Sequence, residues 1–157
     1  MAVQLLYFVE REYPVSVQRL WSAWTDAREL ENWYSPVYLS VIPGSVISEP
    51  VLGGQWALGI DVSANGFNAY FWGRYEEVIE FKKLSHSLSY SQDQLEFQLR
   101  EPTAESHNIV IEFEKLDESA WVKFSQFGEM DSEQVEASRE GMESYLDNLE
   151  QYLENHD

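Results

Sequence analysis

The residues of this sequence that could carry acid–base or metal chemistry are few and far apart. It holds three histidines, His86, His107 and His156, and no cysteine. The histidines show no H-x-x-x-H or H-E-x-x-H spacing, and a dedicated zinc site needs three or four ligands within reach. The sequence also lacks a glycine-rich phosphate loop and a G-x-S-x-G nucleophile turn. We therefore expect no metal and no cofactor, and the pattern leans away from an enzyme.

Two polar residues alternate in phase with apolar ones and are therefore candidates for a buried site. His86 shares its predicted strand face with Leu84 and Leu88. Gln126 shares one with Phe124. A buried polar group needs a hydrogen-bond partner, so each is either satisfied by the protein or available to a ligand. His86, or a tyrosine in the same cavity, is the candidate general acid or base.

The composition indicates one globular domain over residues 1–157, since 44% of the residues are hydrophobic. The formal net charge is −18, from 28 acidic and 10 basic residues. Such a charge repels phosphate groups, which argues against nucleic acid and anionic membrane surfaces as partners. Without a signal peptide or an apolar run of membrane-spanning length, the expected location is the cytoplasm. The acidic surface serves either solubility or the docking of a basic protein.

The first third of the chain predicts a strand followed by two short helices. Residues 3–13 are rich in strand formers. Ser16 and Asp26 are preferred N-cap residues, and apolar residues at helical spacing follow Ser16. The second helix should end before Pro36, because the residue preceding proline avoids the helical region.

From residue 37 the period of the apolar residues changes from that of a helix to that of a strand. Asn65-Gly66 is a hairpin signal, and 92–106 reads as a polar loop. In 67–75 the alternation allows either Phe71 and Tyr75 or Tyr70 and Trp72 to face inward. The predicted extended segments are 37–47, 55–62, 67–81, 84–91, 109–114 and 122–126.

The last part of the chain predicts one long amphipathic helix, capped by Asp131 or Ser132. One face carries an apolar stripe that includes Met142, Tyr145 and Leu149, while the opposite face is acidic. A stripe of this kind must lie against the only large apolar surface available, which is the sheet.

Four collinear segments resemble those of a known family. Residues 14–36, PVSVQRLWSAWTDARELENWYSP, resemble its opening segment, and GGQW at 53–56 resembles its Gly-Gly-x-Trp turn. GRYEEVIEFKKL at 73–84 and GMESYLDNLEQYLE at 141–154 are similar to its central strand and its last helix. The family is that of the C-terminal domain of the activator of heat-shock protein 90 ATPase, within the START-like, SRPBCC or birch-pollen-allergen superfamily. The matching residues in the first segment are Val17, Trp21, Ala23, Thr25, Leu30, Trp33 and Pro36.

The resemblance, which covers about residues 5–154, implies an α+β helix-grip fold. A curved antiparallel sheet of six to seven strands would wrap around the long C-terminal helix and leave a cavity between them. Met142 stands where the family usually has tryptophan. Trp33 is expected at the mouth of the cavity. Together with the alternation, the resemblance makes these the candidate ligand-binding residues: Trp33, Trp56, Leu58, Phe71, Tyr75, His86, Leu88, Ile111, Phe113, Phe124, Gln126, Met142, Tyr145 and Leu149.

Three functions follow as hypotheses. The first is a binding module for a small apolar or aromatic ligand, such as a lipid or polyketide. The second is an enzyme of cyclase or hydrolase type that uses His86 or a cavity tyrosine. The third is a co-chaperone-like domain that docks a protein partner. The chain would act as a monomer or a homodimer.

Overall fold

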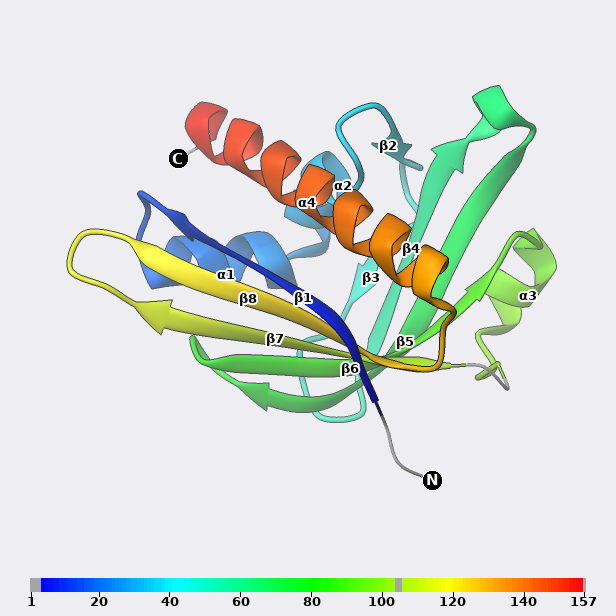
Figure 1. The fold of residues 1–157 in the computed structure, drawn as a ribbon, viewed down its shortest axis with the longest axis horizontal. Coiled ribbons are helices and arrows are strands. Elements are labelled where there is room, and N and C mark those ends of the chain that lie inside the picture. Colours follow the sequence, from blue (N-terminus) through cyan, green and yellow to red (C-terminus); the bar gives the residue numbers. More distant parts are fainter. Residues whose placement is uncertain (1–3, 104–105, 157) are drawn as a thin grey trace.

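The computed structural model describes residues 4–103 and 106–156, and Figure 1 shows its fold. Its elements, in chain order, are β1 (Gln4–Tyr13), α1 (Val17–Thr25), α2 (Ala27–Trp33), β2 (Ser40–Val41), β3 (Ile47–Ser48), β4 (Gln55–Val62), a 3₁₀ turn (Ser63–Asn65), β5 (Phe67–Ile79), β6 (Lys83–Ser91), α3 (Gln94–Leu99), β7 (His107–Lys115), β8 (Ala120–Gly128) and α4 (Ser132–Asn155).

The strands form one antiparallel sheet in the order β1-β8-β7-β6-β5-β4-β2, and β3 also pairs with β4. The sheet curls, and α4 runs across its concave side (Figure 1). This arrangement confirms the predicted α+β helix-grip fold. Within the described ranges, no helix is both long enough and apolar enough to cross a bilayer.

Local hydrogen bonds explain where the helices begin. Ser16 Oγ accepts from the backbone N–H of Arg19 at 3.0 Å and caps α1. Asp26 caps α2 in the same way, and Asp131, rather than Ser132, caps α4. Each cap satisfies one of the backbone donors that a helix N-terminus leaves free.

The predicted loop at 92–106 is partly wrong, because residues 94–99 form α3. Asp93 caps this helix, and Arg100 ends it in the left-handed region with φ 54°. The helix has only one buried residue, Phe97, so its sequence carries no apolar stripe that would announce it.

The contacts of α3 show which side chains of β5 face away from α4. Phe97 stacks on Tyr70 with ring centroids 4.8 Å apart, and it contacts Trp72 edge-on at 6.2 Å. Tyr70 and Trp72 are therefore buried on the convex side of the sheet, while Phe71 and Tyr75 belong to the core beneath α4.

The segment between α2 and β4 is less extended than the sequence predicts, since β2 and β3 have two residues each. Gly53-Gly54 forms the expected turn, and each position requires glycine for a different reason. Gly53 has φ +81°, which L side chains rarely adopt. At Gly54 a Cβ would lie 2.0 Å from the carbonyl oxygen of Glu49, so only glycine fits.

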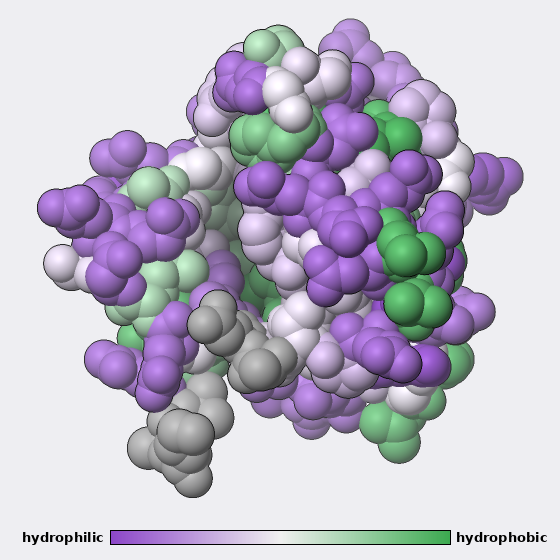
Figure 2. Space-filling model, turned by 90° about the vertical axis from the view of Figure 1, so that its right-hand side faces the viewer, coloured by the Kyte–Doolittle hydropathy of each residue, from purple (hydrophilic) through white to green (hydrophobic). Residues whose placement is uncertain are grey.

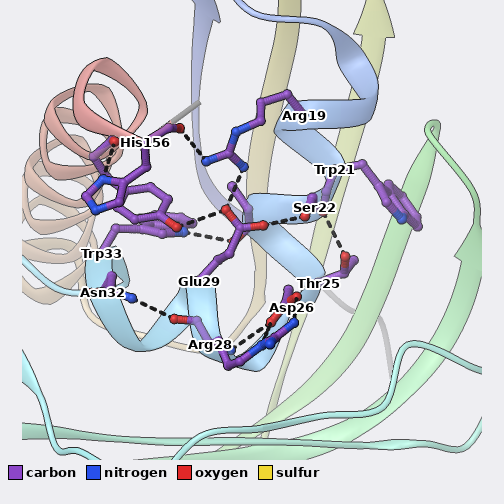
Figure 3. A network of polar contacts seen from close by, with 12 residues as sticks. Arg19, Trp21, Ser22, Thr25, Asp26, Arg28, Glu29, Asn32, Trp33 and His156 are labelled. Carbon is purple, nitrogen blue, oxygen red and sulfur yellow. Dashed lines mark hydrogen bonds and ion pairs between the residues drawn. The ribbon is translucent and has the colours of Figure 1, made fainter.

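Two groups of charged residues hold α4 against the rest of the molecule. Arg11 of β1 pairs with Asp147 at 2.7 Å and with Glu143 at 3.2 Å. Near the C-terminus, Glu29 of α2 accepts hydrogen bonds from Arg19 and Ser22 (Figure 3). Glu29 also accepts a hydrogen bond from the hydroxyl of Tyr152 in α4. The second group joins α1, α2 and α4.

Candidate functional site

A cleft of about 1370 Å³ lies between the N-terminal half of α4 and the concave side of the sheet. Figure 2 shows the molecule hollowed at this end, with hydrophobic side chains inside the hollow. The volume exceeds the 300–1,000 Å³ that is usual for drug-sized ligands. The wall includes the aromatic side chains of Tyr7, Tyr34, Trp56, Phe67, Phe71, Tyr90, Phe124 and Tyr145.

The structure separates the predicted site residues into two groups. Those that line the cleft are Trp56, Phe71, Leu88, Phe124, Gln126, Met142 and Tyr145. Those that lie in the core and do not line it are Trp33, Leu58, Tyr75, His86, Ile111, Phe113 and Leu149. Alternation along the strands and the helix identified inward residues, but it does not distinguish the cleft from the packed core at the other end of α4.

Trp33 has no exposed surface, so the prediction that it lies at the mouth of the cavity is wrong. Its indole Nε1–H donates to the carbonyl oxygen of Ala23 at 2.8 Å. Its ring meets Trp24 edge-on, with centroids 4.8 Å apart. The tryptophans Trp21, Trp24 and Trp33 are all buried, and they fasten α1 and α2 to the sheet.

His86 is sealed behind the cleft wall with 1% of its surface exposed. Its ring stacks on Trp56 at 4.4 Å and meets Tyr75 edge-on at 5.9 Å. Its Nδ1 lies 2.8 Å from the carbonyl oxygen of Ser87, which requires a proton on Nδ1 and leaves Nε2 bare. Nε2 has no hydrogen-bond partner in the described ranges. Burial lowers the pKa of His86 to about 4.

Gln126 reaches the cleft as part of a chain of hydrogen bonds that sequence reasoning missed. Tyr7 donates from its hydroxyl to Gln126 Oε1 at 2.6 Å, and Gln126 Nε2 donates to His107 Nδ1 at 2.8 Å. His107 Nε2 in turn lies 3.2 Å from the carbonyl oxygen of Glu129. The amide of Gln126 is therefore fixed by the protein on both sides.

Tyr34 and Tyr145 bring two phenol groups to the cleft. Their rings meet edge-on with centroids 5.1 Å apart. In the described part of the chain neither hydroxyl forms a hydrogen bond, and neither is a fully buried unpaired atom, so both face the open space of the cleft although Tyr34 is only 7% exposed. Burial raises the pKa of both phenols well above their ordinary value, so both remain neutral donors at physiological pH.

The charged side chains among the described residues of the cleft wall are acidic. Among the described residues that line it, none is Lys or Arg. Glu129 and Asp131 lie on its wall, where β8 leads into α4. Asp131 is occupied as the N-cap of α4, whereas Glu129 is exposed.

Solved structures from other organisms have the same architecture. The chain is similar to the crystal structure of an AHSA1 protein from Silicibacter pomeroyi, with a TM-score of 0.80 and 19% identity over 99% of this chain and 100% of that one. It is also similar to a crystal structure from Chromobacterium violaceum, with a TM-score of 0.76 and 17% identity over 96% of each chain. A solution structure from Arthrobacter aurescens gives 0.77 and 19% over 94% of this chain and 85% of that one. At these identities the likeness shows the fold.

The long helix held by a curved antiparallel sheet defines a START-like, helix-grip protein. The family model described as Activator of Hsp90 ATPase homolog 1-like protein matches residues 14–154, and the chain belongs to that family. Among curated proteins, none matches the sequence. Family and fold together support a ligand-binding or co-chaperone-like module.

Proposed function

We propose that this protein binds a small apolar or aromatic molecule in the cleft between the sheet and the N-terminal half of α4. The observation that carries the proposal is the cleft itself, about 1370 Å³ of space walled mainly by aromatic and aliphatic side chains. A mostly apolar cleft with a few convergent polar groups is the usual form of a small-molecule site.

The position of His86 favours binding over acid–base catalysis by that residue. A general base must lie within hydrogen-bond reach of the proton that it abstracts. His86 is absent from the residues that line the cleft, and Trp56 stacks on its ring. The co-chaperone alternative comes from the family description and from the acidic surface, and no contact within the described ranges favours it.

Native mass spectrometry of freshly purified protein tests the proposal directly, because a bound molecule would appear as an added mass. Thermal-shift measurements against a panel of neutral and anionic aromatic compounds and lipids would complement it. We expect at least one compound to raise the melting temperature, since a ligand that binds only the folded state stabilises that state. Absence of any bound mass together with absence of any shift would contradict the proposal.

Met142 offers a matched variant for the same measurement. Met142 lines the cleft, and the larger indole of Met142→Trp would occupy part of its volume. We expect weaker binding of any ligand that raises the melting temperature of the wild type. Leu153→Met, in the core at the other end of the same helix and outside the cleft lining, serves as the control and should bind as the wild type does.

A further inference from the structure

Among the described tyrosines that line the cleft, Tyr34 and Tyr145 are the two whose hydroxyls form no hydrogen bond. Gln126 and Tyr7 are engaged with each other, and Gln126 is also bonded to His107. Tyr34 is more than nine-tenths buried, lines the cleft and has no partner in the described part of the chain. Neither hydroxyl is a fully buried unpaired atom, so each faces the space of the cleft. A molecule that displaces water from the cleft must replace the hydrogen bonds that water makes with these hydroxyls.

The chemistry of the phenols limits what that molecule can be. A phenol is neutral at physiological pH, and burial raises the pKa of both hydroxyls further, so each offers an O–H donor as well as acceptor lone pairs. A carbonyl or ether oxygen of a ligand is the complement of that donor. Tyr34, the C-cap of α2, and Tyr145 of α4 meet edge-on with ring centroids 5.1 Å apart, so both rings lie on the same part of the cleft wall.

The surrounding charge decides the charge of the ligand. An anion moved into the cleft would leave water without meeting a Lys or Arg among the described lining residues, and burying an unpaired charge is costly. Glu129 on the wall and the net charge of −18 add repulsion. Fatty-acid carboxylates and phosphorylated headgroups are thus disfavoured.

We propose that the cleft selects an uncharged aromatic ligand whose carbonyl or ether oxygen accepts a hydrogen bond from Tyr34, Tyr145 or both. This inference rests on the proposed binding function and adds a chemical class and an anchoring pair to it. Its two parts are separable, since one concerns the acceptor and the other concerns charge.

Three probes of nearly equal shape test it on the full chain by isothermal titration calorimetry. Fluorenone is a neutral tricyclic ketone, fluorene is the same ring system without the acceptor, and fluorenone-2-carboxylate carries a negative charge. We expect fluorenone to bind roughly tenfold more tightly than fluorene, as one or two net hydrogen bonds allow. The carboxylate should bind at least about tenfold more weakly than fluorenone, because it is not paired with a cation.

Variants then assign the acceptor contact to the phenols. Tyr34→Phe and Tyr145→Phe remove the hydroxyls and keep the rings, so each should lower fluorenone affinity and leave fluorene affinity unchanged. Tyr38→Phe is the control, because Tyr38 is exposed and lies outside the cleft lining. Circular dichroism of each variant checks that it folds, and either of the two phenol variants alone suffices for the test.

The outcomes separate this inference from the proposed function. Equal affinities for fluorenone and fluorene, a preference for the carboxylate, or no effect of either phenol variant would overturn the inference. Failure of all three probes to bind would overturn it as well. In each of these cases the proposed function survives if native mass spectrometry or the wider panel reveals another bound molecule, and it fails only if both are negative.

Discussion

The imidazole of His86 stacks on the indole of Trp56, with ring centroids 4.4 Å apart and planes 19° from parallel. Trp56 lines the cleft and His86 does not, so a titratable ring lies one side chain behind the ligand site. The burial that keeps His86 out of the cleft also lowers its pKa, so the stability of the folded protein depends on pH.

We expect the protein to lose stability as the pH falls from about 6.5 to about 4. The ordinary histidine pKa is 6.5, whereas burial lowers that of His86 to about 4. Between these values the unfolded chain binds a proton that the folded chain does not, so acid favours unfolding. The contribution is on the order of 3 kcal/mol at its largest. His86→Phe should remove it, which urea denaturation across this pH range measures as a difference from wild type. His156→Gln, at the exposed C-terminal end, is the control, and parallel pH profiles for His86→Phe and wild type would refute the assignment.

Two glycines should respond in opposite directions to alanine. At Gly141, in the interior of α4, a Cβ would meet nothing within 4 Å. Gly141→Ala should therefore stabilise the protein by about 0.5–1 kcal/mol, the usual gain in a helix interior. At Gly73 a Cβ would lie 1.8 Å from the carbonyl oxygen of Ser87, across the β5–β6 pair. Gly73→Ala should cost roughly 3 kcal/mol because the two strands must separate. Melting temperatures that move in the same direction for both variants would contradict this pair of expectations.

The ion pair between Arg19 and Glu29 should matter more than the exposed pair next to it. Both partners are largely shielded from water, and Glu29 also accepts from Ser22 and Tyr152. Arg19→Ala should cost roughly 2 kcal/mol, since it leaves a poorly hydrated carboxylate without its cation. Arg28→Ala removes an arginine whose side chain is 92% exposed, and it should leave the denaturation midpoint unchanged. Comparable midpoints for the two variants would show that burial does not set the strength of this pair.

Leu149 and Met142 should separate stability from binding. Leu149 is completely buried and lies outside the cleft lining, whereas Met142 faces the cleft. Leu149→Ala should cost about 2–5 kcal/mol of unfolding free energy, as large-to-small core changes do, with ligand affinity unchanged below the melting temperature. Met142→Ala should change the affinity of any ligand identified by mass spectrometry. A loss of affinity on Leu149→Ala in protein that is still folded would place that residue in the site.

Apart from the helix-grip fold, which the family resemblance implied, the predictions that the structure confirms depend on local interactions. Ser16, Asp26 and Asp131 cap helices through side chains that bond to backbone donors two or three residues away, so the sequence alone reveals them. Asn65-Gly66 likewise predicted the β4–β5 hairpin, which forms through the 3₁₀ turn.

The features that sequence reasoning missed depend on tertiary register. Tyr7 meets Gln126, 119 residues further on, only because β1 pairs with β8 in one particular register. Trp33 finds its partner Ala23 through the packing of two helices, and that contact draws the indole into the core. No periodicity in the sequence encodes either contact. The sequence does not predict helix α3, because Phe97 is the only buried residue of that helix.

The attachments of α4 are unevenly spread along its length. Arg11 holds Glu143 and Asp147, and Tyr13 donates to the carbonyl oxygen of Leu146 at 2.9 Å. Asn148 Nδ2 donates to the carbonyl oxygen of Trp33 at 2.8 Å, still further towards the C-terminus. Among the described residues, these contacts hold α4 through its C-terminal half. The N-terminal half of α4 covers the cleft. Amide hydrogens between the first turn of α4 and residue 143 should exchange faster than those beyond residue 143, and a molecule in the cleft should slow exchange most in this N-terminal half.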